Sequence, residues 1–104
     1  MSLIAELSLF PVDKGPSVSA YVARAVGIVR QSGLPHQLTP MGTCIEGEWG
    51  EVMAVVERCF EALAADSDRV YLTLKVDWRR GREGGLGSKT GAVERVLAGQ
   101  GGAK

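Results

Sequence analysis

The sequence predicts an α+β fold, a two-layer sandwich in which two helices cover one face of a four-stranded antiparallel sheet. Apolar and polar residues alternate over residues 3–10 and again over residues 70–77, a period typical of strands with one buried face. Two of the segments between them repeat apolar residues at helical spacing. The length of 104 residues fits one domain with a modest core.

The first predicted element is a strand over residues 3–10. One side of this strand carries four apolar residues: Leu3, Ala5, Leu7 and Leu9. The other side is mixed and carries Ile4, Glu6, Ser8 and Phe10. Residues 11–16 contain two prolines and a glycine, which predicts a turn, and Ser17 is then expected as the N-cap of a helix.

A helix follows this turn and is succeeded by two short strands. The apolar stripe of the helix recurs at helical spacing: Val18, Tyr21, Val22, Ala25, Ile28 and Val29. Gly33 is expected just past the end of the helix, and Pro35 prevents the helix from continuing. Residues 36–47 predict two short strands with a bend at residues 40–42.

A second amphipathic helix and a last strand complete the pattern. The helix is predicted from seven residues at helical spacing: Trp49, Val52, Met53, Val56, Cys59, Phe60 and Leu63. Among these, Trp49, Cys59 and Phe60 are expected in the core or in a subunit interface. Residues 66–68 end the helix. The strand over residues 70–77 then alternates its apolar residues with Tyr71, Thr73, Lys75 and Asp77.

The order β-α-β-β-α-β is that of a ferredoxin-like sandwich, with two helices on one face of a four-stranded antiparallel sheet. We expect a single domain over residues 1–98 that includes a short C-terminal helix within residues 88–97. Val93, Val96 and Leu97 would face inward from that helix. Residues 99–104 are expected to form a flexible tail.

Charge and composition exclude several classes of protein. Lys and Arg together number 12, as do Asp and Glu, so the basic surplus of a nucleic-acid or membrane-surface binder is missing. No apolar run approaches the roughly 18–20 residues of a membrane span. The N-terminus has no signal-peptide pattern. Cys44 and Cys59 form no CxxC motif, and two reduced thiols indicate a cytoplasmic protein.

No catalytic or metal-binding constellation stands out. His36 is the single histidine, and no zinc spacing, P-loop, GxSxG or HExxH motif is present. The loop after the first strand lacks the phosphate-binding arginine that acylphosphatases of this topology need. The stacking pattern of RNA-recognition domains is also missing. We therefore expect no catalytic residue, no metal and no cofactor.

The face of the sheet that the helices leave uncovered is the candidate functional surface. It is expected to present hydroxyls, a carboxylate and aromatic rings, with Thr39, Met41 and Thr43 added from the two short strands and their bend. Such a surface suits a small flat ligand held by stacking and hydrogen bonds. It equally suits a plain subunit interface without a ligand, and the spacing alone does not separate the two.

Four segments resemble the small thiamine-binding protein family, the hydroxymethylpyrimidine/thiamine-binding, YkoF-like group. They are residues 6–11 (ELSLFP), 32–35 (SGLP), 38–43 (LTPMGT) and 45–49 (IEGEW). The resemblance covers about residues 3–97. It implies a ferredoxin-like subunit, a homo-oligomer that is commonly a tetramer built as a dimer of dimers, and binding of thiamine through its hydroxymethylpyrimidine ring. It implies no catalytic activity.

The chemistry of an aminopyrimidine suggests a role for each candidate residue. Phe10 and Met41 would form an aromatic and thioether wall for the flat ring. Hydroxyl groups would come from Ser8, Thr39 and Thr43. The bend residue Gly42 and the carboxylate of Glu6 complete the predicted site: Glu6, Ser8, Phe10, Thr39, Met41, Gly42 and Thr43.

Several of these assignments have open alternatives. Glu6 could pair with Lys75 instead of a ligand, and Phe10 could be interface packing. Thr43 shares a face with Ile45 if their strand is regular, and Ile45 should be buried, so Thr43 reaches the uncovered face only if a bulge lies near Gly42. The sequence therefore predicts a cytoplasmic, non-catalytic, homo-oligomeric binder of thiamine or its pyrimidine moiety. The alternative is a structural or regulatory oligomer without a ligand.

Overall fold

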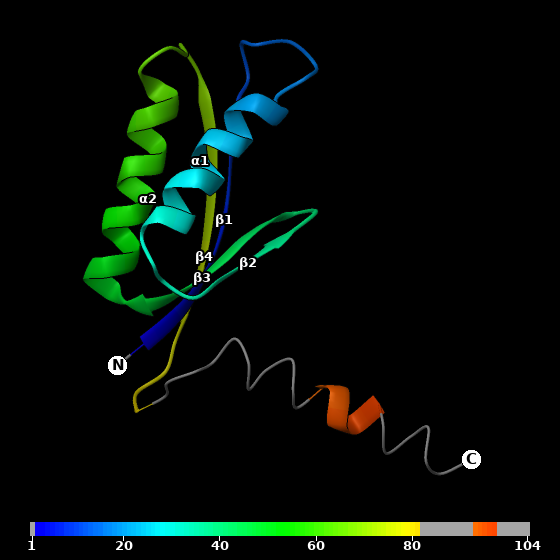
Figure 1. Cartoon of the computed structure of the whole chain (residues 1–104), viewed down its shortest axis with the longest axis vertical. Helices are drawn as coiled ribbons and strands as arrows, with labels where there is room; N and C mark the ends of the chain where they lie inside the picture. Colours follow the sequence, from blue (N-terminus) through cyan, green and yellow to red (C-terminus); the bar gives the residue numbers. More distant parts are fainter. Residues whose placement is uncertain (1, 82–92, 98–104) are drawn as a thin grey trace.

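A computed structural model describes residues 2–81 and 93–97 of the chain (Figure 1). Its elements follow the predicted order: β1 (Ser2–Pro11), α1 (Ser19–Gln31), β2 (His36–Thr39), β3 (Gly42–Glu48), α2 (Trp49–Ala64) and β4 (Val70–Trp78). A short helix occupies residues 93–97. None of the described helices is long and apolar enough to cross a membrane.

The four strands form one antiparallel sheet in the order β2-β3-β1-β4. Both helices pack on β1 and on each other, and their apolar stripes face the sheet. This topology is the ferredoxin-like sandwich that the sequence predicts. β1 and β3 are the central strands, so β2 and β4 each have one edge that no strand of the described residues pairs with.

The alternation of β1 is confirmed. The odd-numbered residues Leu3, Ala5, Leu7 and Leu9 are buried against the helices. Register places Ala5 between Ile45 of β3 and Val76 of β4, so the three residues lie on the same side of the sheet, although Val76 on the edge strand is 38% exposed. The even-numbered residues of β1 consequently lie on the face that the helices do not cover.

β3 has no bulge, which decides the open question about Thr43. Ile45 is fully buried, and Thr43, two residues earlier, is only 6% exposed on the same face. Its partner across the ladder is Leu7, a core residue. The expectation that Thr43 lies on the uncovered face of the sheet is therefore wrong, because a regular strand keeps residues two apart on one side.

The two helices begin differently from each other. α2 starts with a capping box in which Glu48 N–H donates to Glu51 Oε1 over 3.1 Å. α1 starts later than expected, with Val18 at the N-cap and no side-chain cap, so the assignment of Ser17 as N-cap is wrong. Gly33 follows α1 with φ near 76°, as expected for a residue just past a helix end.

Some predicted inward positions are exposed. Trp49 at the start of α2 and Phe60 near its end are both exposed, so neither belongs to the core of this chain. Val93, Val96 and Leu97 are also exposed, because no described element covers them. The remainder of the predicted C-terminal helix and the predicted tail over residues 99–104 lie outside the described residues.

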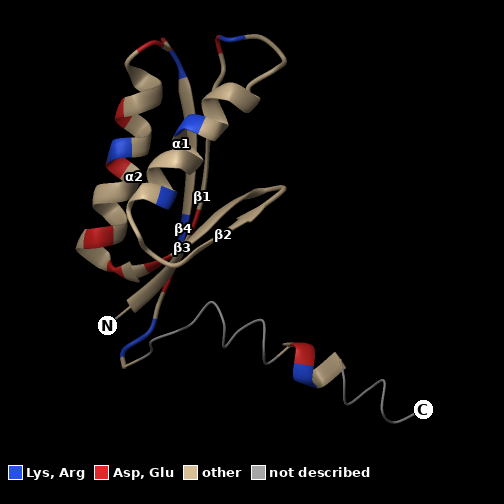
Figure 2. Ribbon diagram, in the orientation of Figure 1, with Lys and Arg blue, Asp and Glu red and all other residues tan. Residues whose placement is uncertain are grey.

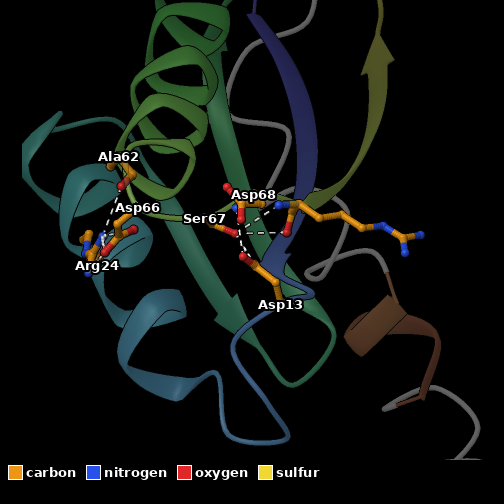
Figure 3. A network of polar contacts seen from close by, with 7 residues as sticks. Asp13, Arg24, Ala62, Asp66, Ser67 and Asp68 are labelled. Atoms are coloured by element: carbon orange, nitrogen blue, oxygen red, sulfur yellow. Dashed lines mark hydrogen bonds and ion pairs between the residues drawn. The ribbon is translucent and has the colours of Figure 1, made fainter.

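Two polar clusters join the loops at one end of the sandwich (Figure 3). Asp13, in the loop after β1, accepts hydrogen bonds from the Ser67 hydroxyl and, over 2.8 Å, from the Asp68 N–H. Arg24 of α1 donates to Ala62 O at 3.1 Å and pairs with Asp66 at 3.2 Å at the end of α2. These contacts hold the β1–α1 loop beside the α2–β4 loop and α1 beside the last turn of α2.

Candidate functional site

A cavity opens where the central strands separate. β1 and β3 pair only as far as Leu7 and Thr43, although β1 continues to Pro11 beside β4. The β2–β3 hairpin turns away from β1 beyond this point (Figure 1). The space between the end of β1, the start of α1 and the hairpin is a cavity of about 300 Å³.

None of the described ionisable side chains lines this cavity. Its walls are aliphatic apart from one aromatic ring, one thioether and three hydroxyls, in the following set: Leu7, Ser8, Leu9, Phe10, Val18, Val22, Leu38, Thr39, Pro40, Met41, Gly42 and Thr43. A lining of this kind suits an uncharged, partly polar ring.

The three hydroxyls differ in what they already bind. Thr39 Oγ1 donates to Gly42 O at 3.0 Å and accepts from the Met41 N–H at 3.3 Å, so it holds the hairpin turn together. Thr43 and Ser8 make no side-chain hydrogen bond with the described residues, although Thr43 is almost fully buried. Two hydroxyls therefore remain available to a ligand in the cavity.

The aromatic and thioether side chains stand at the rim. Phe10 stacks on Tyr71 of β4 with ring centroids 5.7 Å apart and planes 17° from parallel. This stacking fixes one face of the Phe10 ring on the uncovered side of the sheet. Met41, at the tip of the hairpin, lines the cavity and is 80% exposed.

Gly42 is required by close packing at the cavity edge. A Cβ at this position would lie 2.8 Å from Leu7 O, closer than carbon and oxygen can approach. The glycine therefore lets the first residue of β3 approach the β1 backbone where the two strands part. Its role in the site is structural, through the shape of the wall.

Glu6 is the one predicted site residue that does not line this cavity. It lies on the uncovered face of β1 opposite Lys75, with Glu6 Oε1 3.8 Å from Lys75 Nζ. Both line a separate, shallow cavity of about 310 Å³ with Ile4, Val76 and Asp77. The structure thus brings six of the seven predicted residues together and leaves Glu6 in the alternative role, as a partner of Lys75.

Half of the cavity lining was not predicted as part of a site. These residues are Leu7, Leu9, Val18, Val22, Leu38 and Pro40. The sequence shows Val18 and Val22 only as part of an apolar helix stripe; Val18 is the N-cap of α1, and Val22 lies in its first turn. A signal did exist in residues 38–43, which were singled out as one segment, but nothing local shows that the hairpin leaves β1.

The cysteines lie outside the cavity and have no catalytic partner in the described part of the chain. Burial raises the pKa of the Cys59 thiol to about 11, and burial together with the nearby Glu6 carboxylate raises the pKa of Cys44. Both are protonated at neutral pH and so are poor nucleophiles. No group of three potential metal ligands occurs within residues 2–81 or 93–97.

Comparison with known proteins assigns the family. A family model described as "Thiamine-binding protein" matches residues 5–94, which is most of the chain. The chain belongs to the thiamine-binding protein family. The resemblance read from the sequence is thereby confirmed, and this family is one of binding proteins, not an established enzyme family.

Bacterial and archaeal proteins are among those similar to this chain in sequence or structure. A UPF0045 protein of Mycobacterium bovis is 46% identical over 98 residues, covering 93% of this chain and 96% of the relative. The crystal structure of a hypothetical protein of Methanocaldococcus jannaschii superposes with a TM-score of 0.84 at 32% identity, covering 89% of this chain and 96% of that one.

A Thermotoga maritima protein, whose name proposes a role in thiamine biosynthesis or salvage, shares the fold. Its crystal structure superposes with a TM-score of 0.80 at 20% identity, covering 89% of this chain and 99% of that one. At this identity the comparison establishes the common architecture. The chain's membership of the family is shown by the match to the family model over residues 5–94 and by relatives such as the Mycobacterium bovis protein.

Proposed function

We propose that this chain is a non-catalytic, cytoplasmic binding protein for thiamine or its hydroxymethylpyrimidine moiety, and that it acts as a homo-oligomer. The family assignment supports thiamine-related binding. The cavity at the end of β1 is the proposed site, with Ser8, Phe10, Met41 and Thr43 as the contacting side chains. Thr39 and Gly42 shape its wall.

The buried Thr43 hydroxyl carries this proposal. A buried polar group without a partner costs about 1–3 kcal/mol, so an unused hydroxyl in a cavity wall favours a ligand that completes it. Thr43 is 6% exposed and lines the cavity without a hydrogen bond to the described residues. An aminopyrimidine offers both ring-nitrogen acceptors and an amine donor, and a hydroxyl can serve either.

The rest of the cavity suits the flat ring of the same ligand. Phe10 offers an aromatic surface that is already oriented by Tyr71. Met41 offers a polarizable thioether at the opposite rim. Because no charged side chain among residues 2–81 and 93–97 lines the cavity, the neutral pyrimidine end of thiamine fits there better than its cationic thiazolium end.

The uncovered face of the sheet favours a second candidate, an oligomer in which this face is only an interface. Phe10 and Tyr71 form a stacked, partly exposed aromatic pair on that face. Aromatic residues are enriched in protein–protein interfaces relative to the rest of the surface. The two candidates differ in one respect, since only the first requires the cavity to hold a ligand.

Titration calorimetry with thiamine and with hydroxymethylpyrimidine tests the proposal. We expect saturable binding of both compounds, and a Thr43→Val variant should lose about tenfold in affinity because one hydrogen bond is lost. Thr73→Val is the matched control, since Thr73 is exposed on β4 and lines neither cavity described above. It should bind as the wild type does.

Two results would contradict the proposal. Absence of binding at millimolar concentrations of both compounds would leave the interface-only candidate. Equal affinities of the wild type and Thr43→Val would remove Thr43 from the site and place the ligand elsewhere. Circular dichroism spectra of both variants establish that any loss of binding does not arise from unfolding.

A further inference from the structure

A second groove adjoins the proposed pyrimidine cavity. It has a volume of about 360 Å³ and shares Val22 and Leu38 with that cavity. Its other lining residues all come from α1: Ser19, Ala23, Val26, Gly27 and Arg30. A ligand that reaches past Val22 and Leu38 therefore enters a groove that runs along the outer side of α1.

Gly27 creates part of this groove without a structural reason for being glycine. It lies within α1, where glycine costs about 1 kcal/mol relative to alanine. A Cβ at this position would meet nothing within 4 Å, and the backbone there does not adopt the left-handed region. Neither packing nor backbone conformation requires a glycine here. The consequence of the glycine that is left to consider is the open space in the groove where a side chain would otherwise stand.

The charge of α1 gives the groove a preference for anionic groups. α1 carries two arginines and no carboxylate, whereas α2 carries three glutamates and one arginine (Figure 2). Arg24 is already bound to Asp66 and to the end of α2. The exposed Arg30 side chain lines the groove and pairs with none of the described carboxylates.

We propose that this groove is a second subsite that binds the phosphorylated tail of the ligand, with Arg30 as the residue that recognises the phosphate. The inference rests on the proposed function, because it takes the pyrimidine ring to occupy the adjoining cavity. Guanidinium groups bind phosphate oxygens by charge-assisted, often bidentate hydrogen bonds. The ligand class is thus an aminopyrimidine compound that carries a phosphate ester.

The reach of the tail separates two members of that class. Val22 and Arg30 are eight residues apart, which is about 12 Å along a helix axis. Long side chains on a helix lean toward its N-terminus, so the Arg30 side chain is expected to shorten this gap. A phosphate attached beyond the thiazolium ring of thiamine spans such a distance better than one attached directly to the hydroxymethylpyrimidine. We therefore expect thiamine phosphate to benefit more than hydroxymethylpyrimidine phosphate.

Calorimetric titrations with these two phosphates, with their unphosphorylated parents and with inorganic phosphate test the subsite. The wild type should bind thiamine phosphate about fivefold more tightly than thiamine at low salt, a ratio that fits an exposed ion pair. Rising ionic strength should reduce the ratio. Inorganic phosphate alone should not compete, since it lacks the ring.

Three variants make the test specific. Arg30→Gln should abolish the preference for thiamine phosphate and leave hydroxymethylpyrimidine binding unchanged. Arg58→Gln removes the same charge from α2, where it lines neither the cavity nor the groove, and should keep the preference. Gly27→Leu fills the groove where a side chain meets open space, so it should weaken binding of thiamine phosphate while the protein remains folded.

The outcomes separate this inference from the proposed function. If hydroxymethylpyrimidine binds but phosphorylation brings no advantage, or if Arg30→Gln keeps the advantage, the second subsite is refuted and the first site stands. If no pyrimidine compound binds the wild type, the proposed function is refuted and the subsite with it.

Discussion

The threonine hydroxyls of the cavity differ in role because the backbone groups near them differ in whether they already have hydrogen-bond partners. The Thr39 hydroxyl stabilises the two-residue turn, where it donates to the Gly42 carbonyl and accepts from the Met41 N–H. Thr43 lies in a regular strand whose backbone groups are already paired with β1 and β2. Its hydroxyl therefore forms no hydrogen bond with the described residues and is available to the proposed ligand.

Gly42 gives a sharp prediction at this scale. Gly42→Ala would place a methyl group 2.8 Å from Leu7 O, so β1 and β3 must move apart. We expect the free energy of unfolding to fall by about 1–3 kcal/mol, as for other overpacked sites. Denaturant titration measures the loss. A variant as stable as the wild type would show that the strands separate here without cost.

The hydrogen bonds of Asp13 predict a pH dependence. Those from Ser67 and Asp68 lower the pKa of Asp13 from 3.8 to about 2 in the folded protein. The folded pKa is the lower one, so this contribution to stability is present above about pH 4 and is lost as the pH falls toward 2. The melting-temperature difference between wild type and Asp13→Asn should therefore narrow from pH 6 to pH 2. A constant difference would contradict this assignment.

At the scale of elements, the starts and ends of the helices follow local rules unequally. α2 begins where the sequence suggests and has a complete capping box. α1 begins two residues after Ser17 with Val18 at the N-cap, and it has no side-chain cap because a valine side chain cannot accept a hydrogen bond. Val18 and Val22 both line the cavity. The N-terminus of α1, which lacks a stabilising side-chain cap, lies beside the proposed site. Departures from local stability rules are expected at functional sites.

Substitution by alanine should change the free energy of unfolding in opposite directions at two glycines in and after α1. Gly27→Ala should raise the free energy of unfolding by about 0.5–1 kcal/mol, because alanine favours the helix and its methyl group meets open space. Gly33→Ala should lower the free energy by about 1–2 kcal/mol, because φ near 76° is unfavourable for any residue with a Cβ. Calorimetric melting of both variants checks the pair, and a shift of equal sign would refute the explanation.

At the scale of the whole molecule, the helices cover one face of the sheet and no described element covers the other. That face carries the Phe10–Tyr71 stack and the Glu6–Lys75 pair. β2 and β4 add two unpaired strand edges. Exposed edges and aromatic surface favour association with further copies of the chain, in line with the predicted homo-oligomer.

Sedimentation velocity tests this association. We expect the wild type to sediment as an oligomer and Tyr71→Glu to dissociate toward smaller species, because a carboxylate that a second copy of the chain buries on this sheet face is unfavourable. Glu57→Lys changes a charge on the exposed side of α2 and should leave the oligomer intact. A monomeric wild type, or an unchanged assembly in Tyr71→Glu, would show that the sheet face is not the interface.

Much of the fold was predictable because its signals are local. Alternation in β1 and β4 and the stripes of α1 and α2 identified each element within a few residues. The exposed positions of Trp49 and Phe60 were not predictable. The sequence shows an apolar stripe on the helix but does not show how much of that stripe the sheet and the other helix cover. Six of the seven predicted site residues line one cavity, which reflects their nearness in two short segments of the chain.

The sequence by itself determined the order of the elements, the inward face of β1 and the family of the protein, because periodicity and short segments need no knowledge of distant contacts. Only the tertiary structure decided where β1 and β3 cease to pair, which face Thr43 occupies and that Glu6 faces Lys75 instead of the cavity. Strand register and hairpin direction depend on contacts between residues more than 30 positions apart. The cavity exists because those distant contacts end at Leu7 and Thr43.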